Sequence, residues 1–215
     1  PPAFATRHRV PAQRLNAYEI EPTLVAGVNW KPVRAELGVT AFGINAYIAN
    51  SGELVVEAHD ETGGGAGGHE ELYAVIAGRA TFTVDGEDVD APSGTFVLVD
   101  PGEHREARAV EDGTTVLALG GKPGEPYRVS EWEFRFRAWR AYTDGDRDAA
   151  LELLEEGLRT YPESGAIRFF QAFAAIEAGD EEAAVGLLGE AVEKEPRTRD
   201  WIEAEPAFDP IRDRL

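Results

Sequence analysis

Cysteine is absent from the 215-residue chain, which excludes disulfide bonds, thiolate nucleophiles and cysteine-ligated metal sites. Long apolar runs are absent too, because no stretch approaches the roughly 20 residues that a helix needs to cross a bilayer. The opening letters PPAFATRHRVPAQ lack the apolar centre of a secretory signal. These absences predict a cytoplasmic protein with no membrane partner.

Basic residues are also few, since the chain has 21 Lys and Arg against 40 Asp and Glu and a formal net charge of −19. Residues 1–130 hold 10 basic and 19 acidic side chains, and residues 131–215 hold 11 and 21, so the acidity is spread along the chain. Such a surface repels polyanions, and we expect no nucleic-acid partner. The 18 arginines against 3 lysines are typical of high-GC bacterial coding.

A repeat is visible in the second half of the chain. The segment AWRAYTDGDRDAALELLEEGLRTYP aligns with AFAAIEAGDEEAAVGLLGEAVEKEP at a constant offset of 34 residues. Small residues let helix axes approach, glycine adopts the positive φ that ends a helix, and proline cannot continue one. The segment therefore predicts two helical hairpins. The aligned pairs are Ala138 with Ala172, Gly145-Asp146 with Gly179-Asp180, Ala150 with Ala184, Leu154 with Leu188, and Pro162 with Pro196.

This pattern resembles the tetratricopeptide repeat over roughly residues 131–198. Two repeats are few, because about three are normally needed for an independent stack. A C-terminal capping helix over residues 199–215, with Trp201 against the last hairpin, is expected to compensate. The first helix carries an aromatic stripe that is either core, against the first part of the chain or the next helix, or a ligand groove: Trp132, Phe136 and Trp139.

Before residue 130 the pattern changes to short segments rich in Val, Thr, Phe and Tyr and bounded by Gly, Pro and Asp. These predict strands about ten residues apart. Asp85-Gly86 lies between two of them and is a strong hairpin signal. Closely spaced antiparallel strands indicate a sandwich or barrel. The segments are VTAFGINAYIA, ELVVEAH, ELYAVIAG, RATFTVDG, GTFVLVD and TTVLALGG.

The stretch HEELYAVIAGRATFTVDGEDVDAPSGTFVLVDPGEHREARA resembles the cupins, small double-sheet β-barrels with a ligand or metal site inside. Glu71 stands seven residues before Gly78, where the metal-binding glutamate of the family falls. Gly94, Pro101-Gly102 and His104 follow the second cupin motif, with a turn-to-histidine spacing that is one residue short. The resemblance implies an all-β cupin or jelly-roll barrel, followed by an all-α tetratricopeptide-like helical hairpin domain, and it implies a homodimer.

The predicted organisation has five parts, and the short linker KPGEPYRVSE followed at once by aromatic residues predicts a packed junction between the two folded units. The parts are an N-terminal extension with early strands (1–38), the cupin β-barrel (39–122), the linker (123–130), two tetratricopeptide-like repeats (131–198) and the capping helix (199–215).

The histidine pair of the first cupin motif is missing, because the glycine-rich run 63–68 stands in its place. If this run is an insertion, His59 and Glu61 lie two apart on an extended strand and face the same side. With His104 they form a 2-His-1-carboxylate face, typical of ferrous iron sites. Glu71 is then a fourth ligand or orients a histidine. The cofactor expected in this interpretation is one divalent metal, Fe, Mn, Ni or Zn.

Two other interpretations stay open. His69 and Glu71 are also two residues apart and form a competing ligand pair. Alternatively the barrel has lost its metal and holds no cofactor. In that case His59 and His69 flank a surface loop, His104 caps a turn and Glu61 is solvated. The glycine run is then either a loop tip with high conformational entropy or a lid over the barrel mouth.

Three functions follow, and whether the chain is an enzyme stays open because fold does not fix function. The leading hypothesis is a binding module, regulatory in role, whose barrel holds a small-molecule ligand and whose repeats present a concave face to a protein partner. The second is a metal-dependent cupin enzyme, an oxygenase or an isomerase, that uses a His-x-Glu pair and a distant histidine. The third is a structural adaptor whose barrel serves for dimerisation.

Overall fold

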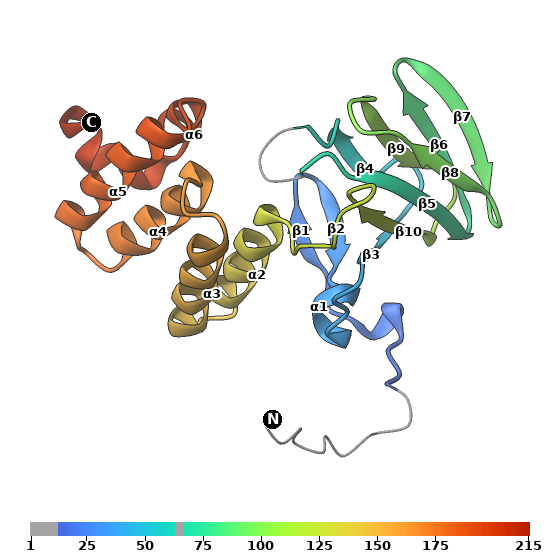
Figure 1. Ribbon diagram of the computed structural model, residues 1–215, viewed down its shortest axis with the longest axis horizontal. Helices are drawn as coiled ribbons and strands as arrows, with labels where there is room; N and C mark the ends of the chain where they lie inside the picture. The colour runs from blue at the N-terminus through green and yellow to red at the C-terminus, as the bar shows by residue number, and fades with distance from the viewer. Residues whose placement is uncertain (1–12, 63–66) are drawn as a thin grey trace.

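The structure, a computed structural model, describes residues 13–62 and 67–215. A β-rich unit occupies the first part of the described chain and a helical unit the last part, and Figure 1 shows them side by side. This order agrees with the predicted all-β barrel followed by an all-α helical domain.

The β unit contains ten strands in the described part of the chain, with a short 3-10 helix η1 (Ala17–Glu19) before them and helix α1 (Val33–Leu37) after the second. The early strands predicted within residues 1–38 are β1 and β2, and β2 pairs with β3. The strands are β1 (Thr23–Val25), β2 (Val28–Lys31), β3 (Gly43–Ala49), β4 (Leu54–His59), β5 (Glu70–Ala77), β6 (Arg79–Val84), β7 (Glu87–Pro92), β8 (Phe96–Val99), β9 (Arg105–Ala109) and β10 (Thr114–Gly121).

These strands form two antiparallel sheets, in the orders β1-β2-β3-β10-β5-β8 and β4-β9-β6-β7. Strands β3 to β10 divide between the sheets as β3-β10-β5-β8 and β4-β9-β6-β7, which is the arrangement of a double-sheet jelly roll. The predicted hairpin is confirmed, because Asp85 and Gly86 join β6 to β7 and both have positive φ, as a two-residue type I′ turn requires.

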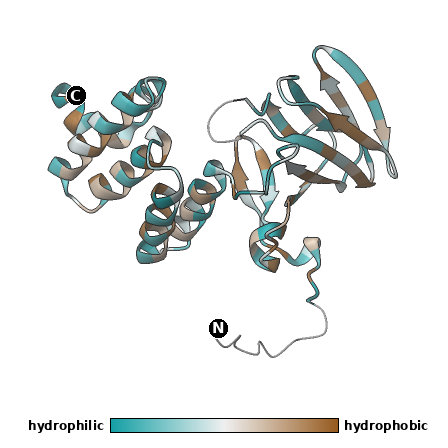
Figure 2. Ribbon diagram, in the orientation of Figure 1, coloured by the Kyte–Doolittle hydropathy of each residue, from teal (hydrophilic) through white to brown (hydrophobic). Residues whose placement is uncertain are grey.

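The barrel core lies between the two sheets. Along β9, Arg105, Ala107 and Ala109 are buried while the residues between them are more exposed, as expected when alternate side chains face opposite sides of a sheet. Figure 2 shows hydrophobic and hydrophilic residues alternating along the strands. The larger buried side chains of the core include Tyr73 and Phe82. At the end of the barrel next to α2, polar side chains line a cavity instead.

The helical unit consists of two hairpins, as predicted from the repeat. Gly145 and Gly179 have φ of +86° and +82° where the first helix of each hairpin ends. Asp146 and Asp180 then cap the second helices, each accepting a backbone N–H at 3.0 Å, which satisfies a donor that the helix start leaves unpaired. The helices are α2 (Glu131–Thr143), α3 (Arg147–Thr160), α4 (Gly165–Glu177) and α5 (Glu181–Lys194).

Small residues lie where the helices of each hairpin cross, and the four repeat alanines are buried: Ala138, Ala150, Ala172 and Ala184. The last residues form two helical segments, α6 (Thr198–Ala204) and η2 (Pro206–Arg214), rather than the single capping helix predicted over residues 199–215. Proline at the first position of η2 fixes the start of the second segment. Phe208 is fully buried against the last hairpin, and Trp201 packs beside it.

The two units meet in a packed junction, as the short linker predicted. Trp30 of β2 is fully buried, and the rings of Trp132 and Phe136 of α2 contact it edge-on with centroids 5.9 and 5.8 Å away. Beside these rings, Arg34 donates to both carboxylate oxygens of Glu133, and the two side chains are 7% and 1% exposed. Trp132 and Phe136 of the aromatic stripe thus pack against the barrel core while only partly buried, and both also line the cavity beside α2.

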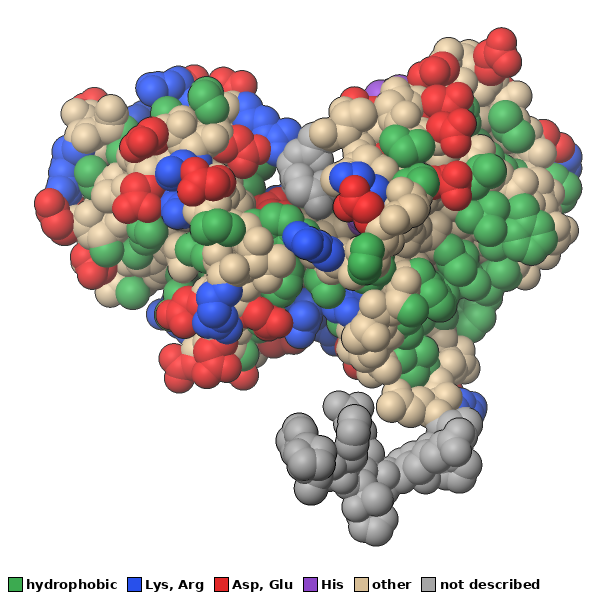
Figure 3. Space-filling view, in the orientation of Figure 1, with side chains coloured by type: hydrophobic (Ala, Val, Ile, Leu, Met, Phe, Trp, Pro, Cys, Tyr) green, Lys and Arg blue, Asp and Glu red, His purple; other side chains and the backbone are tan. Residues whose placement is uncertain are grey.

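Acidic side chains lie over both units in Figure 3, in line with a charge that is spread along the sequence. In the described part of the chain, none of the helices has the length and apolar character needed to pass through a membrane.

Candidate metal centre and ligand cavity

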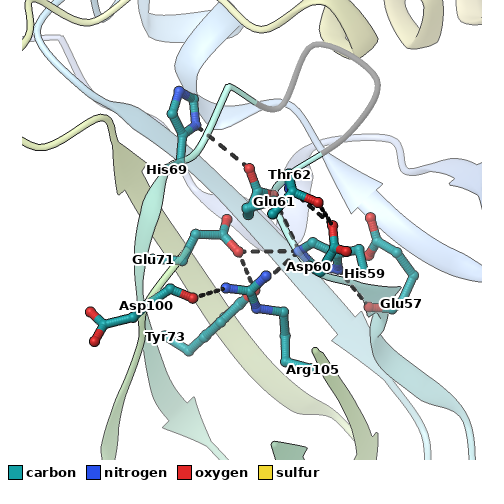
Figure 4. Close-up of polar contacts among 10 residues, drawn as sticks. All are labelled: Glu57, His59, Asp60, Glu61, Thr62, His69, Glu71, Tyr73, Asp100 and Arg105. Carbon is teal, nitrogen blue, oxygen red and sulfur yellow. Dashed lines mark hydrogen bonds and ion pairs between the residues drawn. The ribbon is translucent and has the colours of Figure 1, made fainter. Parts of the chain in front are cut away.

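Three of the candidate residues meet at the end of the barrel next to α2. His59 is the last residue of β4, Glu61 follows in the loop, and Glu71 is the second residue of β5. One ligand atom from each of the three lies within 4.8 Å of the others. Figure 4 shows the three side chains gathered around the same space.

The imidazole of His59 lies between two carboxylates. Its Nε2 atom is 3.2 Å from Oε1 of Glu61 and 3.2 Å from Oε2 of Glu71. Its Nδ1 atom is 2.7 Å from the carbonyl oxygen of Glu57, which can only accept, so Nδ1 carries a proton. A neutral ring would then point the lone pair of Nε2 at two negative oxygens. The arrangement therefore requires a positive centre at Nε2, which is either a second proton or a metal cation.

In the metal-free protein that positive centre is a proton. Burial by itself lowers the pKa of His59, but hydrogen bonds to Glu61 and Glu71 outweigh burial and raise the pKa to about 10. His59 is thus cationic at neutral pH when no metal is bound. An Nδ1–H that donates to a backbone carbonyl is also the contact that usually orients a metal-binding histidine. The same ring position therefore suits a metal at Nε2.

Glu61 is buried and strained. Its side chain is 8% exposed, and its Oε2 atom has no hydrogen-bond partner among the described residues. Its backbone has a φ of 56°, a left-handed conformation that costs a residue with a Cβ about 1–2 kcal/mol. Strain of this kind is found mainly at functional sites. A buried carboxylate oxygen without a donor is unfavourable; it is Oε1 of Glu61 that faces His59, whereas the unpartnered Oε2 lies 3.9 Å from Nδ1 of His69.

Glu71 is held by its surroundings in the ionised form. The hydroxyl group of Tyr73 donates to Oε2 of Glu71. Burial raises the pKa of Glu71, but His59, Tyr73 and Arg105 together outweigh burial and lower it. Gly120 lies opposite Glu71 on β10, where an added Cβ would come within 3.3 Å of the Glu71 Cγ atom. The glycine therefore leaves room for this side chain.

His104 does not join the group. Its side chain is exposed at the rim of the cavity, and its backbone N–H donates to the carboxylate of Asp85 at 2.9 Å. The 2-His-1-carboxylate face expected from His59, Glu61 and His104 is not assembled, and Glu71 lies in the third place.

Arg105 explains this difference. In the second cupin motif the histidine stands one residue further from the Pro-Gly turn than His104 does, and Arg105 occupies that inward-facing position. It pairs with His59 across β4 and β9 and is fully buried. The turn before it is one residue short, and a shift of one residue reverses the side that each strand residue faces. Its Nη2 atom donates to the carbonyl oxygen of Asp100 at 3.1 Å, whereas Nε and Nη1 lack partners among the described residues. Sequence analysis missed Arg105, although its alternation with Ala107 and Ala109 was a usable signal.

His69 lies at the edge of the site. Its Nδ1 atom is 3.9 Å from Oε2 of Glu61, and its ring centroid is 6.0 Å from that of Tyr127. The structure does not bring His69 and Glu71 together as a ligand pair in the described residues. In the glycine-rich run, the backbone N–H of Gly68 donates to the carbonyl oxygen of Glu61 at 2.8 Å. The loop-tip and lid interpretations concern residues 63–66, which lie outside the described residues.

A cavity of about 430 Å³ opens above the three residues, a volume within the range of small-molecule sites. Its walls come from both folded units. The barrel supplies an acidic floor, and the helical unit supplies aromatic and arginine side chains opposite. On the barrel side lie Tyr47, Glu57, His59, Glu61, Glu71 and Tyr73, and on the helical side lie Trp132, Arg135, Phe136, Arg197 and Trp201.

Comparison with known proteins identifies a repeat in the helical unit. Residues 141–204 match the tetratricopeptide repeat. This match covers the second helix pair and extends to the end of α6, close to the range predicted from the 34-residue offset. Comparison with curated protein sequences gives no significant match.

Solved cupin structures resemble the β unit. A cupin protein from Bacteroides fragilis is 18% identical, with a TM-score of 0.41 over 55% of this chain and 90% of that one. KdgF from a Halomonas species is 16% identical, with a TM-score of 0.43 over 55% and 94%. A Cupin 2 conserved barrel domain protein from Salinispora arenicola is 16% identical, with a TM-score of 0.40 over 57% and 92%. The strand order of the β unit by itself shows a double-sheet jelly roll, an architecture that cupins share.

Proposed function

We propose that the barrel binds a divalent metal cation on His59, Glu61 and Glu71 and holds a small organic ligand beside it. The position of His59 carries the proposal: Nδ1 is committed to a carbonyl oxygen, and Nε2 points between two carboxylates. The convergence of one ligand atom each from His59, Glu61 and Glu71 within 4.8 Å also supports it.

The charge of the site also supports a divalent cation. The floor carries the carboxylates of Glu57, Glu61 and Glu71, and the buried guanidinium of Arg105 opposes them. Carboxylates outnumber the buried guanidinium, which favours a cation beside them. One imidazole and two carboxylates form a donor set rich in oxygen, which suits manganese or ferrous iron better than a thiolate-preferring metal. The donor set is compatible with each of the four metals expected from the sequence, Fe, Mn, Ni and Zn.

Metal titration of the purified full-length chain tests this proposal. After removal of metal with a chelator, the wild type is expected to bind one Mn²⁺ per chain by isothermal titration calorimetry. His59→Ala and Glu71→Gln each remove a ligand, and each is expected to weaken binding by at least about tenfold, since even indirect perturbation of a metal site typically costs 10–100-fold.

His104→Ala is the matched control for the metal titration. His104 is a histidine at the same cavity but faces outward, so this variant is expected to bind Mn²⁺ as the wild type does. Equal Mn²⁺ affinity in the wild type, His59→Ala and Glu71→Gln would contradict the proposed site, as would a loss confined to His104→Ala.

A metal-dependent enzyme is the second candidate function. Three protein ligands leave coordination positions open for a substrate, and the cavity gives access to them. An oxygenase or isomerase using His59, Glu61 and Glu71 is consistent with this geometry. His104, the distant histidine of the sequence analysis, has no part in it.

The helical unit is proposed to bind a protein partner as well, as its tetratricopeptide similarity suggests. Trp132 and Phe136 already pack against the barrel core, so the partner would use other parts of the helical surface. The cytoplasmic location and the absence of a nucleic-acid partner stay predictions.

The proposed homodimer is supported by exposed apolar residues on the barrel. Phe96 and Leu98 of the edge strand β8 are 68% and 59% exposed, and Ile76 of β5 is 47% exposed; hydrophobic side chains gather on the outside of the barrel in Figure 3. Apolar patches of this kind often mark interfaces. Light scattering should give twice the chain mass for the wild type and the chain mass for Phe96→Glu/Leu98→Glu, whereas a monomeric wild type would contradict the dimer.

A further inference from the structure

The wall of the cavity opposite the proposed metal belongs to the helical unit. Trp132, Arg135 and Phe136 come from α2, whereas Arg197 and Trp201 come from the start of the C-terminal cap. Helices α3, α4 and α5 separate these elements in the sequence, so only the folded stack brings them to one surface. A ligand that fills the cavity above His59 must therefore contact the repeats as well as the barrel.

The α2 part of this wall is held against the barrel. Trp132 and Phe136 are fixed against Trp30 of the barrel, and the buried pair of Arg34 and Glu133 ties α2 to α1 within the same junction. Rigid walls reduce the entropy that a binding site loses when it takes up a ligand. The helical unit is thus placed to act as a preformed half of the ligand site.

Both arginines of this wall lie near the indole ring of Trp201. The guanidinium of Arg135 lies 6.0 Å from the ring centroid of Trp201, and that of Arg197 lies 5.4 Å from it. Nε and Nη2 of Arg135 contact the carboxylate of Glu131, and Nε of Arg197 donates to Glu195. A guanidinium has five N–H donors, so these contacts leave donors on both arginines that can serve a ligand.

The cavity therefore has carboxylates on the barrel floor and, on the helical wall, two arginines that are each paired with one glutamate and keep further N–H donors. Aromatic side chains line both sides, with Tyr47 and Tyr73 on the barrel side and Trp132 and Trp201 on the helical side. Arginine forms paired hydrogen bonds with carboxylates, and a metal on an oxygen-rich site accepts hydroxyl or carboxylate oxygens.

We infer that the ligand is a small organic acid, which places oxygen donors on the metal and a carboxylate on Arg135 and Arg197. This inference rests on the proposed metal site and deepens it. In this arrangement the helical repeats select the ligand, and the barrel holds the metal that anchors it.

Calorimetry with L-malate, a hydroxy diacid, tests the inference on the full-length protein. Mn²⁺ is titrated first, and L-malate is then titrated into the Mn²⁺-loaded protein. L-malamide, its neutral diamide, serves as the ligand control. We expect Arg197→Gln to weaken L-malate binding about tenfold and Arg135→Gln/Arg197→Gln about 100-fold, since a hydrogen bond to a charged group contributes roughly 1.5–3 kcal/mol. Mn²⁺ affinity should stay at the wild-type value in both variants.

Arg168→Gln is the matched control variant, because Arg168 also pairs with a glutamate, Glu190, but does not line the cavity. It should bind L-malate as the wild type does. Arg197 is about half exposed, so its single variant is expected to fold even if the double variant does not. Three results would show that the inference is wrong while the metal proposal stands. These are a wild type that binds Mn²⁺ but not L-malate, L-malamide binding that is as tight as L-malate binding, and an Arg197→Gln variant that binds L-malate as the wild type does. If the wild type binds no Mn²⁺, the metal proposal itself is wrong.

Discussion

Replacing Glu133 by alanine is expected to lower the free energy of unfolding by about 3–5 kcal/mol. Glu133 is 1% exposed and accepts from two nitrogens of Arg34, which is itself 7% exposed. Without this carboxylate, the guanidinium of Arg34 keeps only its contact from Nη1 to the carbonyl oxygen of Val39, at 2.9 Å. A buried charge that loses its partner is strongly unfavourable, and this charge lies at the junction of the two units. Urea denaturation followed by tryptophan fluorescence measures the change.

Glu190→Ala is the matched control, because Glu190 pairs with Arg168 in an exposed position. Its loss should cost about 1 kcal/mol or less. The double variant Arg34→Met/Glu133→Leu removes both charges from the junction and should recover most of the loss, since apolar residues of similar size often replace buried ion pairs without penalty. An equal, small effect of Glu133→Ala and Glu190→Ala would show that the junction does not depend on this ion pair.

Replacing Gly78 by alanine is expected to cost about 2–5 kcal/mol. Gly78 joins β5 to β6 with a φ of +68°, and an added Cβ would lie 2.5 Å from Oγ1 and 2.8 Å from the Cα atom of Thr114. The left-handed backbone accounts for about 1–2 kcal/mol and the clash for about 1–3 kcal/mol more. Thr114 is fully buried and its Oγ1 accepts the backbone N–H of Arg79 at 3.2 Å, so it has little room to move. Thermal and urea denaturation measure the loss.

Gly86→Ala separates the two contributions. Gly86 has a φ of +85°, but an added Cβ there would have nothing within 4 Å. It should therefore show only the backbone cost of about 1–2 kcal/mol. If Gly78→Ala were no more destabilising than Gly86→Ala, the contact with Thr114 would not be as tight as the structure has it.

The elements of the helical unit were predictable because their signals are local. Asp146 and Asp180 lie 34 residues apart and cap their helices with the same contact, and the glycine before each one has the expected positive φ. A residue that ends or starts a helix acts on its immediate neighbours, so its role can be read without knowledge of the rest of the fold. The Asp85-Gly86 hairpin was predictable for the same reason.

The candidate site was predictable only in part. His59 and Glu61 lie near each other in the sequence, and Glu71 followed from the cupin motif, so all three could be named in advance. That these three residues meet without His104 could not be predicted. It depends on the register of β9, in which Arg105 pairs with His59 and His104 consequently faces outward, and a one-residue difference in the preceding turn decides that register.

By itself, the sequence determined the all-β unit, the helical hairpins, the short junction and the small set of side chains able to hold a metal, because strand and helix periodicities and turn residues act within a few neighbours. Only the tertiary structure decided which of those side chains converge, that Arg105 lies among them, and that α2 and the C-terminal cap complete the cavity. Convergence depends on strand register and on how two folded units pack, and both are set by contacts between residues far apart in the chain.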